Sequence, residues 1–210
     1  MAKIIPEKYD TGQAAGQAPL GGICGQGSHY YYKMMAVDPQ TLSIRHYPDP
    51  VLCLRGKPVE RIDDEVRAVA HRMLQLMHAA PGVGLAAPQV GLSWRMFVAN
   101  ATGSPDDDMV FVNPTLLDPG RDTEELEEGC LSLPDIRGLI RRPKLMTIQA
   151  QDEDGEHFEL TADGLEARIW QHEYDHLDGI LIIDRMARFD RFANRRAIKA
   201  LEAARGGRGA

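Results

Sequence analysis

Two histidines spaced four residues apart, with a glutamate beside the first, form the clearest chemical pattern in this chain. They are His172 and His176, and the acidic residue is Glu173. At about 100° per residue, an α-helix would place both imidazoles on one face, one turn apart, where they can bind a single metal ion. Glu173 would point roughly a quarter turn away, within reach of a water molecule on that ion. The spacing therefore predicts a metal centre with its own general base.

A helix with an apolar stripe must hold this pattern. Leu165 and Ile169 precede the histidines at spacings of four and three residues, so all four positions share one side of a helix. Asp163 is a typical residue before a helix, and Gly179 is a typical stop. We expect a short, central helix over about residues 164–178.

The rest of the sequence predicts an α+β fold. Residues 62–79 repeat apolar side chains at spacings of three and four, which indicates a surface helix, and residues 185–205 predict a basic C-terminal helix. Between them, short segments rich in β-forming residues follow one another mostly without helices, so antiparallel pairing is favoured. Asp154-Gly155 is a strong hairpin signal. The expected strands are 95–99, 109–112, 124–133, 145–151 and 157–161.

A catalytic metal centre typically has three protein ligands and one open position, so the two histidines need a partner. Cys130 is the best candidate, because Gly129 before it allows a ligand or another backbone to approach closely. The alternative is that Cys130 is a small buried core residue, which is the usual role of a lone cysteine.

The segment from Gly82 to Gln89 begins with a Gly-x-Gly pattern but does not predict a phosphate loop. It lacks the third glycine of a dinucleotide fingerprint, no Gly-Lys-Ser/Thr follows, and Pro88 would interrupt the receiving helix. We interpret it as small-residue backbone that runs close to a substrate. The Gln89 NH₂ group can donate two hydrogen bonds, which makes it a suitable partner for a developing oxyanion, although a polar turn residue is the alternative.

Taken together, these three elements resemble the peptide deformylase family. The family's motifs occur in order: Gly-x-Gly-x-Ala-Ala-x-Gln from Gly82 to Gln89, Glu-Gly-Cys-Leu-Ser from Glu128 to Ser132, and Gln-His-Glu-x-Asp-His from Gln171 to His176. Weaker similarity extends from about residue 43 to the C-terminal helix. The resemblance implies antiparallel sheets packed around a central metal-binding helix, with an N-terminal and a C-terminal helix beside them.

The resemblance also implies an activity and a catalytic set. Similar proteins remove the formyl group from the N-terminal formyl-methionine of nascent bacterial or organellar proteins and release formate. Glu173 would be the general acid and base, while the Gln89 side chain and the Leu131 backbone N–H would stabilise the oxyanion. The implied metal ligands are Cys130, His172 and His176.

The resemblance extends to the substrate and the metal. Val83, Leu165 and His172 would help line a methionine pocket. A thiolate ligand suits zinc, iron and cobalt better than magnesium or calcium. The family points to one Fe²⁺ per chain, readily lost to oxidation and replaced by Zn²⁺ or Ni²⁺. The implied peptide-binding residues are Gly84 and Gly129, through backbone hydrogen bonds, and Arg137, at the trailing end.

Composition predicts three parts. Residues 1–40 are rich in glycine and are expected to be a flexible extension, in which Met35 is a candidate native start. Residues 41–184 are the expected catalytic domain, and residues 185–210 a basic helix and tail. Three widely spaced cysteines argue against a disulfide framework, and the sequence shows no export signal or membrane span, so cytoplasm is the expected location.

The charge is unevenly distributed. The chain has a formal net charge of −7, which disfavours non-specific nucleic-acid binding, including DNA. Residues 185–210 contain eight Lys and Arg against two acids, a net +6 that leaves −13 for residues 1–184. This basic segment either docks on ribosomal RNA near the exit tunnel or is a solvated helix face.

Two rival functions fit parts of the sequence. A zinc endopeptidase shares His-Glu-x-x-His, but its third ligand would usually be a downstream His or Glu, and no histidine follows His176. A non-catalytic ribosome-binding protein with a structural metal is the second alternative. Structural zinc sites usually close with four protein ligands, whereas only three are evident here.

Overall fold

The computed structural model describes residues 37–206 of the 210-residue chain. The predicted N-terminal extension and the candidate start Met35 lie outside the described residues, apart from residues 37–40, which lead into the 3-10 helix η1 (Pro39–Thr41). Within residues 37–206, no helix is long and apolar enough to cross a membrane.

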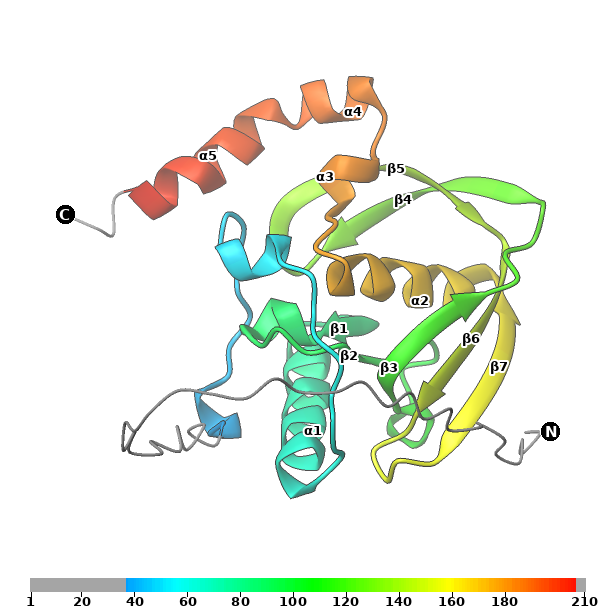
Figure 1. Cartoon of the computed structure of the whole chain (residues 1–210). Helices are drawn as coiled ribbons and strands as arrows, with labels where there is room; N and C mark the ends of the chain where they lie inside the picture. Colours follow the sequence, from blue (N-terminus) through cyan, green and yellow to red (C-terminus); the bar gives the residue numbers. More distant parts are fainter. Residues whose placement is uncertain (1–36, 207–210) are drawn as a thin grey trace, which may run out of the picture.

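The architecture is α+β, as the sequence predicts, with two antiparallel sheets around one central helix (Figure 1). The larger sheet has the order β1 (Gly84–Ala86), β2 (Met96–Ala99), β3 (Met109–Leu117), β6 (Leu145–Gln151) and β7 (His157–Asp163). The second sheet pairs β4 (Thr123–Cys130) with β5 (Leu133–Pro143). The helices are α1 (Asp64–Ala79), α2 (Gly164–Leu177), α3 (Ile182–Arg185), α4 (Arg188–Ala193) and α5 (Arg195–Gly206), with the 3-10 turns η2 (Pro50–Cys53), η3 (Ala87–Val90) and η4 (Pro105–Asp107).

The central helix α2 forms where the sequence predicts it. It begins after Asp163 and ends at Leu177, followed by Gly179 in a left-handed conformation with φ +73°. A side chain at Gly179 would come within 2.7 Å of the Cys53 carbonyl oxygen, so glycine is required there on two grounds. The prediction of one continuous apolar stripe is wrong at its first position, because Leu165 is 55% exposed.

An aromatic cluster holds α2 against the larger sheet. Phe97 and Phe111 stack with ring centroids 4.5 Å apart, and Trp170 of α2 tilts against Phe111 at 5.9 Å. Each of these three rings is almost fully buried. Burying these rings stabilises the fold, because it removes apolar surface from water and because the ring pairs adopt favourable geometries. The cluster therefore fixes the face of α2 that packs against the larger sheet.

The predicted strand over 124–133 is wrong in its extent, because the chain turns after Cys130 and returns as a separate strand, β5. Strand β5 was not predicted. From Ile136 onward its residues alternate between buried and exposed, but the buried positions include Gly138 and Arg142. An inward glycine and an inward arginine break the period-two apolar pattern on which strand prediction depends. The hairpin at Asp154-Gly155 is confirmed by the β6–β7 pairing.

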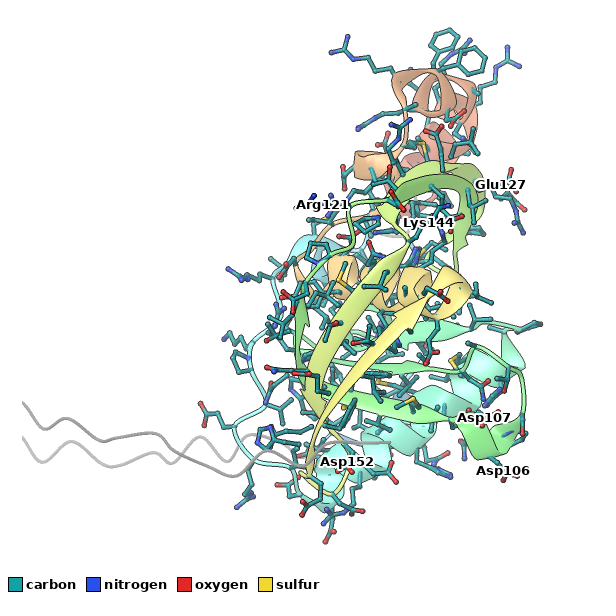
Figure 2. The ribbon with its side chains drawn as sticks, turned by 90° about the vertical axis from the view of Figure 1, so that its right-hand side faces the viewer. Asp106, Asp107, Arg121, Glu127, Lys144 and Asp152 are labelled. Carbon is teal, nitrogen blue, oxygen red and sulfur yellow. The ribbon has the colours of Figure 1, made fainter. Side chains whose placement is uncertain are left out.

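The predicted single C-terminal helix over residues 185–205 is wrong in its continuity, because this range divides into α4 and α5 and follows the short helix α3. We call residues 182–206, which comprise α3, α4 and α5, the C-terminal arm. The chain is extended at Met186, whose side chain is buried against Gly138, where an added Cβ would lie 2.9 Å from the methionine methyl group. Because the Met186 side chain packs on β5, the chain is not helical between α3 and α4. Figure 2 shows the arm at one end of the molecule, opposite Asp106, Asp107 and Asp152.

Candidate metal centre and active site

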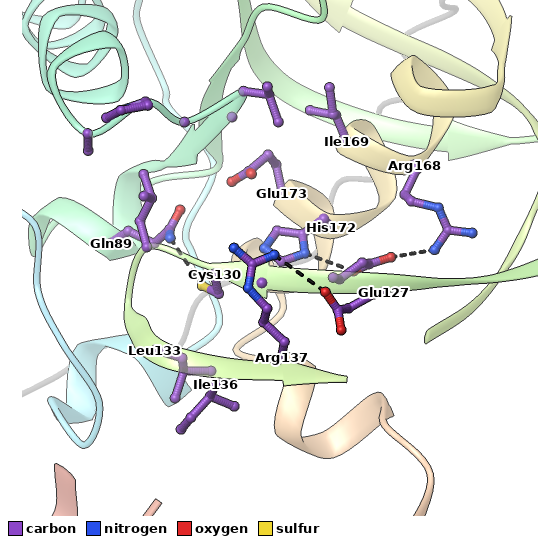
Figure 3. A pocket seen from close by; sticks show the side chains of 18 of the residues that line it. Gln89, Glu127, Cys130, Leu133, Ile136, Arg137, Arg168, Ile169, His172 and Glu173 are labelled. Carbon is purple, nitrogen blue, oxygen red and sulfur yellow. Dashed lines mark hydrogen bonds and ion pairs between the residues drawn. The ribbon is translucent and has the colours of Figure 1, made fainter. Parts of the chain in front are cut away.

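Helix α2 and the end of strand β4 bring the three predicted metal ligands together. Figure 3 shows Cys130 and His172 converging on one cavity. The Cys130 Sγ lies 3.2 Å from the His176 Nε2, and the ligand atoms of Cys130, His172 and His176 all lie within 4.8 Å of one another. Two histidines four residues apart on α2 and a cysteine at least 42 positions before them therefore form one site.

These three groups suit a divalent transition metal. In tetrahedral coordination, a metal about 2.3 Å from sulfur and about 2.0 Å from nitrogen separates the two ligand atoms by roughly 3.5 Å. The spacing between Cys130 and His176 is close to that value. The His172 Nδ1 is already engaged by Glu128 at 3.0 Å, which leaves its Nε2 free to bind. The donor set and its arrangement fit the metal that the sequence predicts.

A buried carboxylate orients His172. Glu128 accepts hydrogen bonds from Arg142 at 2.7 and 2.9 Å and from Arg168 at 2.6 Å, and all three side chains are buried. A buried carboxylate is stable only when it is paired and hydrogen-bonded, and here every lone-pair direction has a donor. Glu128 is therefore held rigidly, and it fixes both the tautomer and the ring orientation of His172.

Arg142 extends this network to Asp175, which precedes His176. Its Nη1 donates to Asp175 at 2.9 Å, and Arg185 of the C-terminal arm donates to the same carboxylate at 2.5 and 3.1 Å. Asp175 lies directly before His176 on α2. One arginine thus links the carboxylate behind His172 to the carboxylate beside His176.

The network shifts the ionisation of its members. Burial alone would lower the pKa of His172, but hydrogen bonds with Cys130 and Glu128 outweigh it and raise the pKa to about 10 while no cation is bound. Burial would raise the pKa of Glu128, whereas hydrogen bonds with His172 and Arg142 lower it far below its usual range. For His176, burial and the nearby His172 charge lower the pKa well below its ordinary value. His176 thus keeps a lone pair for a metal.

Glu173 is buried, and one of its carboxylate oxygens, Oε2, has no hydrogen-bond partner among the described residues. A side chain at Gly84 would collide with the Glu173 carboxylate, so the second glycine of the Gly-x-Gly pattern makes room for it. Burial raises the pKa of Glu173 to about 7, where a carboxylate can both accept and return a proton.

The Gln89 side chain points into the same site from the 3-10 turn η3. Its Oε1 accepts a hydrogen bond from the Ala86 N–H at 2.8 Å. Its Nε2 lies 3.3 Å from the Ser132 Oγ and 3.5 Å from the Cys130 Sγ. The amide therefore presents its NH₂ group, not its oxygen, toward the metal ligands.

A cavity of about 430 Å³ opens over these groups. Every site residue predicted from the sequence lines it except His176, which lies buried beneath it. At the rim, Val83 and Leu165 are largely exposed, and Arg137 pairs with Glu127 at 3.6 Å. The predicted residues on its wall are Val83, Gly84, Gln89, Gly129, Cys130, Leu131, Arg137, Leu165, His172 and Glu173.

Sequence reasoning missed the residues that hold the site in place. Glu128, Ser132 and Asp175 lie inside the motifs but received no role, although a carboxylate two residues from a candidate ligand is a signal for a partner of histidine. Arg142 lies on the unpredicted strand β5, and nothing in its local sequence indicates that it is buried.

Comparison with known proteins identifies the family of this chain. A family model described as polypeptide deformylase matches residues 41–192. The peptide deformylase of Thermotoga petrophila is 45% identical over 144 residues, covering 69% of this chain and 86% of the relative. That of Acidobacterium capsulatum is 44% identical over 161 residues, covering 75% and 94%. A crystal structure of the Plasmodium falciparum peptide deformylase has a TM-score of 0.78 at 34% identity and covers 80% of this chain and 99% of that one. This chain belongs to the polypeptide deformylase family.

Proposed function

We propose that this deformylase works through a single metal ion held by Cys130, His172 and His176, with Glu173 as general acid and base. The family activity is removal of the N-formyl group from the N-terminal formyl-methionine of newly made proteins, with release of formate. The observation that supports the proposed site best is the convergence of one thiol and two imidazoles, all within 4.8 Å, beside an unpaired buried carboxylate.

The protein's own residues account for the proton transfers. When bound, the metal would lower the pKa of a coordinated water and polarise the formyl carbonyl. Glu173 accepts a proton from the attacking water, because its raised pKa of about 7 matches proton transfer near neutral pH. As the carbon–nitrogen bond breaks, Glu173 gives the proton to the nitrogen, so that the peptide departs as a neutral amine.

Negative charge develops on the formyl oxygen as water attacks. The Gln89 NH₂ group lies in the site beside Cys130, and the Leu131 backbone follows directly at the cavity wall. Both groups are assigned as oxyanion donors. Removing one such donor typically costs about 3 kcal/mol of transition-state stabilisation.

The rim of the cavity suits an extended peptide that begins with methionine. Val83 and Leu165 present apolar surface beside His172, which favours an unbranched apolar side chain. Gly84 and Gly129 offer backbone on either side, and Arg137 lies farther out. Val83→Trp should fill this pocket and reduce the preference for formyl-methionine over formyl-glycine peptides. An unchanged preference would rule out the pocket assignment.

Formate release separates this proposal from its rivals. Protein purified anaerobically with iron or nickel is incubated with formyl-Met-Ala and, separately, with a blocked peptide whose internal bonds are intact. The proposal expects formate from the first and no cleavage of the second. Cleavage of internal bonds would indicate an endopeptidase, and a metal-loaded protein inactive on both would indicate a structural metal.

We further propose Fe²⁺ as the native metal, with Zn²⁺, Ni²⁺ or Co²⁺ as substitutes. A mixed thiolate and imidazole set accepts all of these ions, so affinity alone does not select among them. Metal analysis of the active fraction from protein made and kept anaerobically tests the identity. Iron in proportion to activity supports it, and an active fraction with zinc alone contradicts it.

The C-terminal arm is proposed to dock on the ribosome. Phe189 and Phe192 of α4 are 79% and 62% exposed, and the Arg195 guanidinium lies 4.0 Å from the Phe192 ring centre. Aromatic rings beside arginines can stack on unpaired bases while the charges contact phosphates. The exposed basic residues of α4 and α5 are Arg188, Arg191, Arg195, Arg196 and Lys199.

Ribosome co-sedimentation at increasing salt tests the docking proposal. Replacing Arg195, Arg196 and Lys199 by glutamine should weaken binding and flatten its salt dependence, because fewer phosphate contacts release fewer counterions. Arg121→Gln, on an exposed turn outside the arm, is the control. Salt-independent binding, or equal binding by the triple variant, would contradict the proposal.

A further inference from the structure

We propose that Ser132 is a positioning residue, whose hydroxyl holds the Gln89 amide so that one N–H faces the reacting oxygen. This inference rests on the proposed role of Gln89 as an oxyanion donor. Ser132 is fully buried and lies behind the cavity wall rather than in it, so it does not touch the substrate. It would act only through Gln89.

The Gln89 amide has contacts at both of its ends. The Ala86 N–H donates to Oε1 at 2.8 Å, and Nε2 donates to the Ser132 Oγ at 3.3 Å. The reversed orientation would place the amide oxygen against the Cys130 sulfur and would leave the Ala86 N–H facing an NH₂ group. Because a buried backbone donor without an acceptor is costly, the Ala86 contact selects one orientation, and in that orientation the Ser132 hydroxyl accepts from Nε2.

The Ser132 Oγ accepts one of the two amide hydrogens, and the Cys130 Sγ accepts the other until a substrate oxygen replaces it. The Nε2 also lies 3.5 Å from the Cys130 Sγ, so its second hydrogen is directed to the metal side of the cavity. A donor fixed before the reaction needs no reorganisation as charge develops. Without the Ser132 acceptor, the Gln89 side chain keeps the bond to Ala86 and the long contact with the Cys130 sulfur, so its terminal torsion is held less firmly.

The backbone around both residues is held independently of the Ser132 hydroxyl. The Arg45 N–H donates to the Gln89 carbonyl at 2.7 Å, and the Tyr47 N–H donates to the Ser132 carbonyl at 2.9 Å. The extended segment at residues 45–47 therefore ties the two loops together. Removing the hydroxyl should leave these bonds, the turn and the metal ligands in place.

A double-mutant cycle tests the proposal. Ser132→Ala should lower kcat about tenfold, which is less than the 10²-fold or greater loss on removing an oxyanion donor itself. KM, metal content and thermal stability should change little, and Ser132→Thr, which keeps an Oγ, should recover most of kcat. In the Gln89→Ala background, Ser132→Ala should change kcat less than twofold, because residues acting through one group are not additive.

The outcomes distinguish three cases. Unchanged kcat in Ser132→Ala, or an equal loss in both backgrounds, would overturn the positioning role. Unchanged kcat in Gln89→Ala would instead overturn the oxyanion role on which it rests.

A spectroscopic measurement covers the case in which Ser132→Ala does not fold. In the zinc-loaded wild-type protein, one of the two Gln89 side-chain amide hydrogens should exchange slowly with solvent and the other faster. Rapid exchange of both hydrogens would contradict a fixed bond to Ser132.

Discussion

The two flanks of the cavity are built from different chemistry. The charged flank, behind His172, consists of Glu128, Arg142, Arg168 and Asp175, which are all buried. The neutral flank, around Gln89, uses the Ala86 N–H, the Ser132 hydroxyl and backbone carbonyls. Among the described residues, the proposed metal ligands and the proposed oxyanion donors thus have separate supports, which meet at Cys130.

The difference follows from the charge that each flank must tolerate. A carboxylate behind a ligating histidine raises its basicity and fixes its tautomer, which favours binding of a cation. The same carboxylate beside Gln89 would oppose the negative charge that develops on the substrate. Charged partners also need complete pairing when buried, whereas neutral ones do not. We therefore expect changes in the charged flank to affect stability and metal binding, and changes in the neutral flank to affect kcat.

The largest effect is expected where the two flanks meet. Cys130→Ala removes the only sulfur ligand of the proposed set, so both bound metal and formate release should fall to background. Cys53→Ala, at an exposed thiol, should change neither and is the matched control. Metal analysis and a formate assay on the same samples check this. Full metal content in Cys130→Ala would show that the two histidines suffice.

Disrupting the charged flank should lower the stability of the folded protein. Arg142→Met removes the paired bonds to buried Glu128 and one of the bonds to buried Asp175, and it should lower the free energy of unfolding by about 3–5 kcal/mol. Arg141→Met is the control, because Arg141 is 69% exposed and its pair with Glu125 spans 3.9 Å. That change should cost less than about 1 kcal/mol. Equal destabilisation in urea titrations would contradict the importance of the buried network.

Breaking the neutral flank should spare the fold. Gln89→Ala removes a neutral donor and should lower kcat by about 10²- to 10³-fold, with the midpoint of urea unfolding shifted far less than in Arg142→Met. Steady-state kinetics and denaturation of the two variants measure the contrast directly. A Gln89 variant with normal kcat but poor stability would reverse the proposed division between the flanks.

A smaller effect is expected on the stability of the fold at low pH. The pKa of Glu128 is lowered in the folded protein, so its ionised form stabilises the fold fully above the ordinary pKa of 4.5 and loses this contribution as the pH falls below it. The partner His172, with a pKa of about 10, stays protonated throughout that range while no cation is bound. Metal-free wild type should therefore lose stability between about pH 5 and pH 3 more steeply than metal-free Glu128→Gln. An equally steep loss of stability in both proteins would contradict this role of Glu128.

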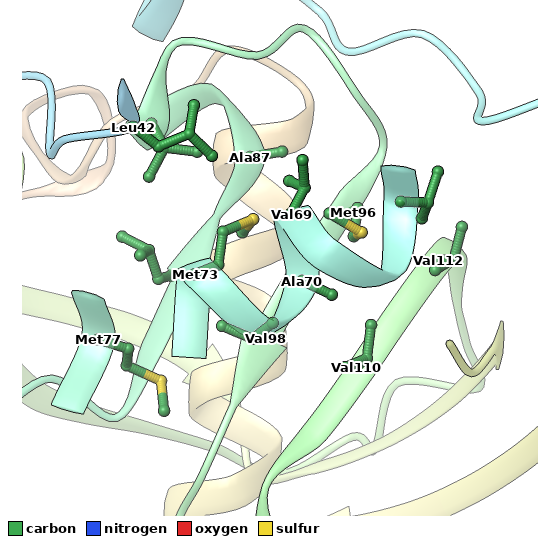
Figure 4. Packing of buried hydrophobic residues seen from close by; sticks show 13 residues of the cluster. Leu42, Val69, Ala70, Met73, Met77, Ala87, Met96, Val98, Val110 and Val112 are labelled. Atoms are coloured by element: carbon green, nitrogen blue, oxygen red, sulfur yellow. The ribbon is translucent and has the colours of Figure 1, made fainter. Parts of the chain in front are cut away.

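The sequence was sufficient for elements whose signal is local. The apolar stripe of α1 appears in the structure as predicted, with Val69, Met73 and Met77 packed against β1, β2 and β3 (Figure 4). The helix begins two residues later than expected, at Asp64, because the Asp63 side chain caps it by accepting hydrogen bonds from the Glu65 and Val66 N–H groups. Both features depend on residues within one or two turns of each other.

Features that depend on distant partners were not predictable. Strand β5 escaped prediction because Gly138 is inward to admit Met186, and Arg142 is inward to meet Glu128 and Asp175. The break between α3 and α4 has the same kind of cause, because Met186 packs against Gly138 of β5. In the site, the motifs indicated the ligands and Glu173, but the roles of Arg142 and Ser132 appear only when separate strands and loops are brought together.

The assignment of Glu173 can be tested by measuring metal content and formate release together in Glu173→Gln, with Glu127→Gln as a control on an exposed carboxylate of the same cavity. We predict that Glu173→Gln keeps its metal but loses formate release by about 10²-fold or more, because only the proton acceptor is removed. Glu127→Gln should remain active. Full formate release by Glu173→Gln would contradict the mechanism.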